Sequence, residues 1–170
     1  MNRDIELSLI DRCFKHLAAG TTTCAQRSGQ GTGRYVQAER FALEMRQVLT
    51  RLPFPVTHTS TLRHVNAFRA TDTQLGPLLV TRDSSGKSHL FYNSCRHRGS
   101  ILVNEEQGVA RRLTCPYHAW SYSTDGSLAN VPEQDACFPG LDKSGLGLVE
   151  IPAVERHGFV WACPGAADPE

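Results

Sequence analysis

Cys95-Arg96-His97 and Cys115-Pro116-Tyr117-His118 are the two segments that decide the fold of this chain, and seventeen residues separate them. Each segment offers one thiolate and one imidazole, which are ligands that iron and zinc take in proteins. The spacings C-x-H and C-x-x-H let the side chains of one segment diverge toward two neighbouring metal ions. The four candidate metal ligands are therefore Cys95, His97, Cys115 and His118.

Two kinds of metal centre take two cysteines and two histidines. A [2Fe-2S] cluster can be held by two cysteines on one iron and two histidines on the other. A structural zinc ion can bind all four in a tetrahedron, and the separation of the segments falls within the range of zinc ribbons. Zinc ribbons and fingers usually pair like ligands, however, whereas each segment here is mixed, and Gly99 and Pro116 shape the loops beside the ligands. The sequence favours the cluster and leaves a zinc-stabilised binding module as an alternative.

The residues around the ligands, 93–99 and 115–122, closely resemble the cluster loops of Rieske non-haem iron oxygenases. The resemblance extends over about 35–163. It implies that Cys95 and Cys115 hold the inner iron of a Rieske [2Fe-2S] cluster, and that His97 and His118 hold the outer iron.

The same resemblance bears on the redox potential of the cluster. Respiratory Rieske proteins carry an additional disulfide between their two cluster loops, but Ser100 and Tyr117 stand at those positions here. The resemblance therefore implies a low-potential cluster, toward about −150 mV.

The arrangement of a helix ahead of the cluster segments resembles the N-terminal part of the large (alpha) subunit of an aromatic ring-hydroxylating dioxygenase. The resemblance implies an electron-transfer domain that accepts electrons from a reductase or ferredoxin. It would pass them to a mononuclear non-haem iron in a catalytic domain or in a neighbouring subunit of a homotrimer. Nothing after the second segment supplies the two histidines and one carboxylate for that iron, so we expect the catalytic domain to be absent and this chain alone to be inactive as an oxygenase. A free-standing Rieske ferredoxin is the second interpretation.

The length and composition are those of a single globular domain with one hydrophobic core. The chain has 170 residues, of which 40% are hydrophobic and 21% charged. Its formal net charge of +1 gives no reason to expect a nucleic-acid partner. The apolar stretches are too short to span a membrane and the N-terminus lacks the form of a secretion signal, so we expect a cytoplasmic protein. Six cysteines then indicate reduced thiols. The four outside the ligand set are expected to be buried or bystander residues: Cys13, Cys24, Cys137 and Cys163.

The N-terminal part is predicted to be helical. Apolar residues recur every four positions over 4–19, and a second apolar stripe over 38–52 stops at Pro53. The faces of both helices are expected to pack into a core. The polar, glycine-rich segment 21–34 between them is predicted to be a flexible linker. The expected domains are 1–34, a helix and linker, and 35–170, the Rieske domain.

The rest of the chain is predicted to be mainly β, in antiparallel sheets with two cluster-binding hairpin loops. Strands are expected at 56–65, 78–81, 89–93, 113–114, 120–123, 146–151 and 158–163, with turns at 83–86 and 125–126. The two loops would meet at one tip with Trp120 beneath them, and Tyr117 and Tyr122 are expected to serve mainly in packing. The remaining histidines lack partners at ligand spacing.

Overall fold

The N-terminal helix of the computed structural model, α1 (Arg3–Ala19), lies where the sequence predicts a helix. The side chain of Asn2 caps it by accepting a hydrogen bond from the Asp4 N–H at 2.9 Å. Gly20 ends it in the left-handed conformation, at φ 60°. None of its residues is buried. Its own unit adds only one turn of 3₁₀ helix, η1 (Thr32–Tyr35), which does not cover the apolar face. The core packing of that face stays a prediction.

The structure describes residues 2–23, 29 and 31–165. Its contacts group into two units, Met1–Gln37 and Ala38–Glu170. The predicted linker 21–34 lies partly outside the described residues, at 24–28 and 30, and its flexibility stays a prediction. Its last residues belong to η1. No helix among the described residues is long and apolar enough to cross a membrane.

The second predicted helix is shorter than expected and changes its winding. α2 (Ala38–Glu44) continues into a π-helical turn, η2 (Met45–Leu49). The N–H and the hydroxyl of Thr50 both donate to the carbonyl oxygen of Met45, at 3.1 and 2.8 Å, and this i to i+5 pattern closes the helix. None of the residues in α2 and η2 is buried, and Phe41 is 61% exposed. The predicted core packing is wrong here, because the sheets pack against one another and leave this face uncovered.

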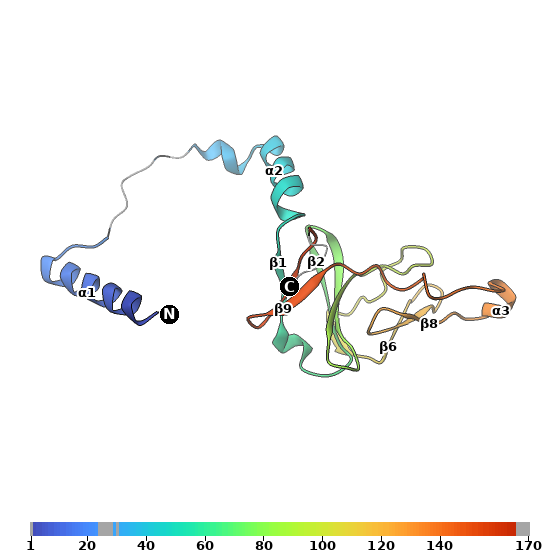
Figure 1. The fold of residues 1–170 in the computed structure, drawn as a ribbon. Coiled ribbons are helices and arrows are strands. Elements are labelled where there is room, and N and C mark those ends of the chain that lie inside the picture. Colours follow the sequence, from blue (N-terminus) through green and yellow to red (C-terminus); the bar gives the residue numbers. More distant parts are fainter. Residues whose placement is uncertain (1, 24–28, 30, 166–170) are drawn as a thin grey trace. The chain divides into compact units, whose positions relative to one another are not determined.

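The chain from Phe54 onward forms antiparallel sheets, as predicted (Figure 1). The described residues hold three of them, with the strand orders β1-β10-β9, β4-β3-β2-β5 and β6-β7-β8. The strands are β1 (Phe54–His58), β2 (Ala67–Thr73), β3 (Gly76–Arg82), β4 (Ser88–Tyr92), β5 (Gln107–Val109), β6 (Arg112–Thr114), β7 (Ser121–Ser123), β8 (Leu128–Asn130), β9 (Ala153–Arg156) and β10 (Phe159–Ala162). A short helix, α3 (Gln134–Cys137), follows β8.

The sheets bury two apolar clusters. One includes Leu62, Leu90 and Val160. The other includes Phe91 and Tyr122 together with the candidate ligands Cys95 and Cys115. The second cluster therefore joins the candidate metal centre directly to the core.

One predicted strand is interrupted. Segment 56–65 is a strand only to His58 and then forms a 3₁₀ turn, η3 (Thr59–Leu62). The His58 side chain accepts a hydrogen bond from the Ser60 N–H at 3.2 Å, and the backbone carbonyl of His58 accepts one from the Thr61 hydroxyl at 2.9 Å. Such local bonds compete with a strand ladder, and here they end the strand.

Segment 146–151 is not a strand either, although it runs along β4. It makes one isolated bridge, Phe91 to Glu150, and backbone hydrogen bonds from Tyr92 to Val149 and from Ile151 to Leu90, at 3.0 and 2.8 Å. The last two strands, β9 and β10, belong to the separate sheet of β1. Four strands, β2, β5, β8 and β9, lie outside the strands that the sequence predicts.

Candidate metal centre

The two segments that carry the candidate ligands fold into loops with the same backbone hydrogen-bond pattern. We call residues 95–100 loop 1 and residues 115–120 loop 2. In loop 1 the Cys95 N–H donates to the Ser100 carbonyl at 2.8 Å, and the Gly99 N–H donates to the Cys95 carbonyl at 2.9 Å. In loop 2 the Cys115 N–H donates to the Trp120 carbonyl at 2.8 Å, and the Ala119 N–H donates to the Cys115 carbonyl at 3.0 Å. Both turns reverse the chain within six residues.

The fifth residue of each loop has a left-handed backbone. Gly99 has φ 69°, and Ala119 has φ 55°. Glycine adopts this conformation without steric cost, whereas an alanine there is strained by about 1–2 kcal/mol. The same backbone is therefore built with an unstrained residue in loop 1 and a strained one in loop 2.

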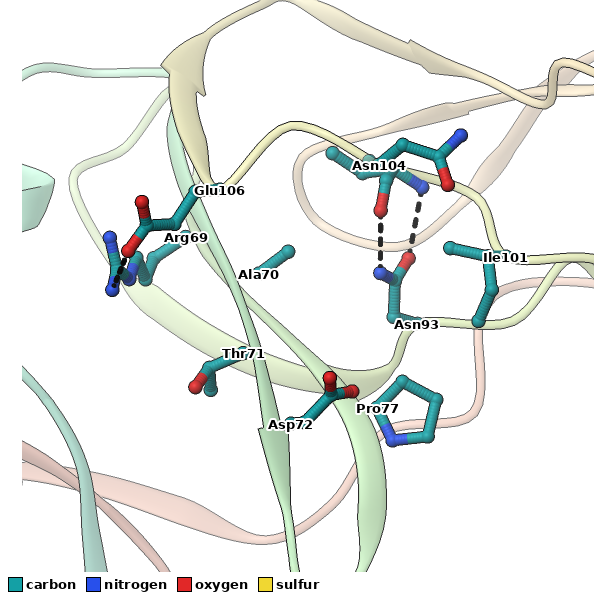
Figure 2. Close-up of a pocket in the computed structure, with 10 residues that line it drawn as sticks. Arg69, Ala70, Thr71, Asp72, Pro77, Asn93, Ile101, Asn104 and Glu106 are labelled. Atoms are coloured by element: carbon teal, nitrogen blue, oxygen red, sulfur yellow. Dashed lines mark hydrogen bonds and ion pairs between the residues drawn. The ribbon is translucent and has the colours of Figure 1, made fainter.

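The loops differ in how their ends are held together. Loop 2 is the tip of the β6–β7 hairpin, as predicted, and Thr114 pairs with Ser121 beside it. Loop 1 is not a β-hairpin, because it joins β4 to β5, which lie at opposite edges of one sheet. The side chain of Asn93 closes it instead. Its amide donates to the Val103 carbonyl at 2.8 Å and accepts from the Val103 N–H at 3.0 Å (Figure 2).

Asn93 also lines a polar pocket of about 470 Å³ on the flank of loop 1. Arg69 pairs with Glu106 at 2.6 Å, and Figure 2 shows this pair on one wall of the pocket. None of the four candidate ligands lines it. The pocket therefore adjoins the centre without being part of it.

The structure brings all four predicted ligands together at the tip of the two loops. The thiols are buried, with Cys95 2% and Cys115 3% exposed. The imidazole centroids of His97 and His118 are 4.7 Å apart. His97 is half-buried and His118 is exposed. The cysteines thus lie on the core side of the tip and the histidines on the outer side.

The surroundings of Cys95 control the charge of its thiol. Burial raises the pKa of this thiol, and the neighbouring Cys115 thiol raises it further, while a hydrogen bond with Tyr122 opposes both. The Tyr122 hydroxyl lies 3.3 Å from Cys95 Sγ and accepts a hydrogen bond from the Arg96 N–H at 3.0 Å. Positive charge from bound iron would offset the cost of burying two thiolates. Tyr122 is fully buried as predicted, and its contacts with loop 1 go beyond packing.

His97 has the one buried side-chain polar atom among the described residues that lacks a hydrogen-bond partner, Nδ1. Its ring stacks on Trp120 at 4.8 Å with 7° between the planes, so Trp120 lies against the loops as predicted. Buried polar atoms without partners are rare in folded proteins and call for an explanation. An imidazole nitrogen that is free of hydrogen bonds and turned away from water is suited to bind iron. The donor set and its surroundings therefore fit a [2Fe-2S] cluster.

Among the described residues, no three cysteine, histidine, aspartate or glutamate side chains form a group that could hold a metal ion.

The cysteines outside the ligand set have different surroundings. Cys13 and Cys137 are exposed, Cys163 is buried, and Cys24 lies outside the described residues. Among the remaining histidines, His89 has carboxylate partners, Asp83 at 3.1 Å and Glu150 at 2.9 Å. The sequence did not predict these contacts, because Glu150 is distant from His89 along the chain.

Comparison with known proteins assigns the family. The model of the Rieske [2Fe-2S] domain matches residues 53–152, which include both loops. The chain belongs to this family. This assignment favours the [2Fe-2S] cluster over the zinc alternative, and it confirms the resemblance seen in the sequence.

Two curated relatives of this Rieske domain are named as the large component or subunit of a dioxygenase. It is 36% identical over 127 residues to the large oxygenase component of the naphthalene 1,2-dioxygenase system of Pseudomonas fluorescens, covering 74% of this chain and 28% of the relative. It is 32% identical over 127 residues to the anthranilate 1,2-dioxygenase large subunit of Acinetobacter baylyi, covering 75% of this chain and 27% of the relative. The chain thus spans less than a third of the length of these relatives.

Solved structures agree with this assignment. Naphthalene 1,2-dioxygenase with indole bound superposes with a TM-score of 0.72 at 30% identity, covering 78% of this chain and 30% of the other. The quaternary ammonium Rieske monooxygenase CntA superposes with a TM-score of 0.72 at 29% identity, covering 81% of this chain and 38% of the other. The Rieske fold predicted from the two segments is confirmed.

Proposed function

We propose that Cys95, Cys115, His97 and His118 hold the Rieske [2Fe-2S] cluster and that the chain transfers single electrons. The observation that supports this most directly is the buried, unpartnered Nδ1 of His97, which lies in the loop that also buries Cys95. The cluster, when bound, supplies a site that takes up and releases one electron.

The four ligands would divide by burial. The buried thiolates of Cys95 and Cys115 would hold the inner iron, and the outer imidazoles of His97 and His118 would hold the other. Tyr122 would orient loop 1 through its contacts with Cys95 Sγ and the Arg96 N–H. The exposed His118 lies on the side where an electron partner can approach.

We further propose that the domain serves an oxygenase of the ring-hydroxylating type. The relatives named above are large oxygenase components, which supports this over a free-standing Rieske ferredoxin. The electron donor would be a reductase or ferredoxin. The acceptor would be a mononuclear iron in a catalytic domain or in a neighbouring subunit of a homotrimer, and the protein would work in the cytoplasm.

Metal analysis and spectroscopy test the proposal. We expect the anaerobically purified chain to contain about two irons and two inorganic sulfides, and to be red-brown. After reduction, its electron paramagnetic resonance spectrum should show one unpaired electron coupled to two imidazole nitrogens. One bound zinc without sulfide would overturn the proposal. So would a cluster signal without nitrogen coupling, since histidine would then not be a ligand.

A further inference from the structure

The two candidate histidine ligands differ in what surrounds their rings. The face of His97 lies against Trp120, which is 4% exposed. Phe138 then meets His97 edge-on, with centroids 5.8 Å apart and planes at 89°. It also meets Trp120 edge-on, at 5.6 Å and 83°. His97, Trp120 and Phe138 therefore form a three-ring cluster.

His118 has no comparable enclosure among the described residues. Its ring is exposed and has Tyr117 beside it, at 3.8 Å and a 39° tilt, and Tyr117 is itself 59% exposed. An exposed tyrosine shields little from water and leaves the ring orientation weakly held. The protein therefore encloses the ring of His97 more than that of His118.

Phe138 comes from a segment that contributes no candidate ligand. After β8 the chain makes an excursion through α3 and returns toward β9 (Figure 1). The Phe138 N–H donates to the Gln134 carbonyl at 2.7 Å, and the Phe138 carbonyl accepts from the Leu141 N–H at 3.1 Å. Farther along, the Leu148 N–H donates to the Gly126 carbonyl at 2.8 Å, which ties the returning chain to the β7–β8 turn. These bonds hold a half-buried aromatic ring against loop 1.

We propose that Phe138 is a positioning residue for His97. It packs edge-on against both rings of the His97–Trp120 stack, and so fixes the direction of the buried Nδ1 and keeps water from that nitrogen. The inference rests on the proposed function, because it takes His97 as a ligand, and it assigns a role to a residue that is neither a ligand nor part of either loop.

Exclusion of water from the surroundings of His97 should lower the reduction potential of the cluster. Two irons, two sulfides, two thiolates and two neutral imidazoles carry no net charge when oxidised and one negative charge when reduced. Water stabilises the charged form more than the neutral form. Phe138 should therefore lower the reduction potential, and its removal should raise it.

The test compares Phe138→Ala with Phe138→Leu and with a matched control in the cluster-containing protein. For Phe138→Ala we expect the equilibrium constant for reduction to rise about threefold, a shift of ~28 mV at 59 mV per tenfold change. Pulsed electron paramagnetic resonance should show a changed or broadened coupling from one of the two imidazole nitrogens, with the other unchanged. Phe138→Leu keeps an apolar cover and should retain the wild-type potential. Phe159→Ala removes an aromatic ring that contacts His58 and Trp161, and it should leave both readouts unchanged.

The outcomes separate the two proposals. If wild-type protein shows no imidazole coupling, the proposed function fails. If wild type shows two couplings but Phe138→Ala keeps the same potential and couplings, the positioning role fails. If Phe138→Ala does not retain a cluster, Phe138→Leu decides: a wild-type potential supports the role, and a raised potential or an absent cluster overturns it.

Discussion

Loop 1 and loop 2 have the same backbone hydrogen bonds but are closed by different means. Loop 2 sits on paired strands, so Thr114 and Ser121 hold its ends through backbone groups. The strands on either side of loop 1 are not paired with each other, and one side chain, Asn93, bonds to both backbone groups of Val103 in place of a strand neighbour. The comparison shows that a ligand loop needs a closed base, and that a side-chain amide can supply the closure where the sheet topology cannot.

Loop 1 also depends on residues that belong to or follow loop 2. Trp120 ends loop 2 and stacks on His97, and Tyr122 follows on β7 and contacts Cys95 and the Arg96 N–H. Among the described residues, the ring contact from loop 1 to His118 comes from the other candidate ligand, His97, with centroids 4.7 Å apart. The support of the two candidate histidines is thus unequal, although their ligand roles are proposed to be alike.

The largest effect, loss of the cluster, should come from replacing the cysteine of either loop, and the two loops should respond equally. Cys95→Ser and Cys115→Ser should each abolish the cluster, because a hydroxyl does not replace the soft thiolate that holds iron. Iron and sulfide analysis with visible absorption measures this. Cys13→Ser, on the exposed side of α1, should keep the wild-type spectrum. A full cluster in either loop variant would show that its loop does not supply a ligand.

A smaller effect, on the free energy of unfolding, should be specific to loop 1, because a side chain closes this loop. Asn93→Ala should lower the free energy of unfolding by about 2–4 kcal/mol, because it leaves the buried N–H and carbonyl of Val103 without partners. Urea denaturation of the cluster-containing protein measures the loss. Asn104→Ala is the matched control in the same pocket, and as an exposed position it should change stability by less than about 0.5 kcal/mol. Equal losses for both variants would mean that Asn93 does not close loop 1.

Exchanging glycine and alanine at the left-handed residue of each loop should change the stability of the protein in opposite directions. Gly99→Ala should destabilise the protein by about 1 kcal/mol through backbone strain alone, since an added Cβ would meet only Ser94 Oγ, at 3.9 Å. Ala119→Gly should relieve the backbone strain at φ 55°. Glycine also raises the conformational entropy of the unfolded chain, which offsets part of this gain, so the protein should be stabilised by about 0.5 kcal/mol net. Thermal denaturation of both variants gives the signs. A destabilised Ala119→Gly variant would show that loop 2 is not strained there.

The same two loops show how far the sequence alone could predict this structure. The meeting of the two candidate ligand segments, the β6–β7 hairpin and the position of Trp120 depend on residues close together along the chain, and they were predicted. The closure of loop 1 was not, because Asn93 bonds to Val103, ten residues away, and nothing local distinguishes that asparagine from one in an ordinary turn. Phe138 was missed for the same reason, since it lies twenty residues beyond the last ligand and reaches His97 only through the returning excursion.

The helices and one strand illustrate a different limit. Apolar periodicity located α1 and α2 correctly, but periodicity does not show what covers an apolar face, and no residue of either helix is buried within its own unit. β2 was missed because Arg69, Thr71 and Asp72 interrupt its apolar pattern. Its place between β3 and β5 depends on partners that are distant in the sequence.

The last comparison concerns the turns at the opposite ends of the strands that carry the loops. β4 leads into loop 1 and starts after a turn at Asp83, whereas β7 leaves loop 2 and ends at a turn at Asp125. In both turns an aspartate accepts hydrogen bonds from the backbone and hydroxyl of the serine two residues on. Only Asp83 also pairs with a histidine, His89, at 3.1 Å.

This difference predicts an unequal response to acid. Burial alone would raise the pKa of the Asp83 carboxyl, but hydrogen bonds from Ser85, His89 and the Lys87 N–H outweigh it and hold the pKa well below its usual range. A carboxyl whose pKa is lowered by folding stabilises the protein above its unfolded pKa of about 3.9, and that stabilisation is lost as the pH falls toward the folded value. Asp83→Asn keeps an acceptor oxygen for the turn and removes the charge. It should therefore be less stable than wild type at pH 7, and the gap should narrow below about pH 4. Asp125→Asn should show a smaller gap, because hydrogen bonds from Ser127 lead the lowering of its pKa and His89 contributes to it only through its charge, without a hydrogen bond. Chemical denaturation between pH 7 and pH 3 measures both gaps. Equal gaps for the two variants would show that the pairing with His89 adds nothing, and that the two turns, unlike the two loops above them, are equivalent.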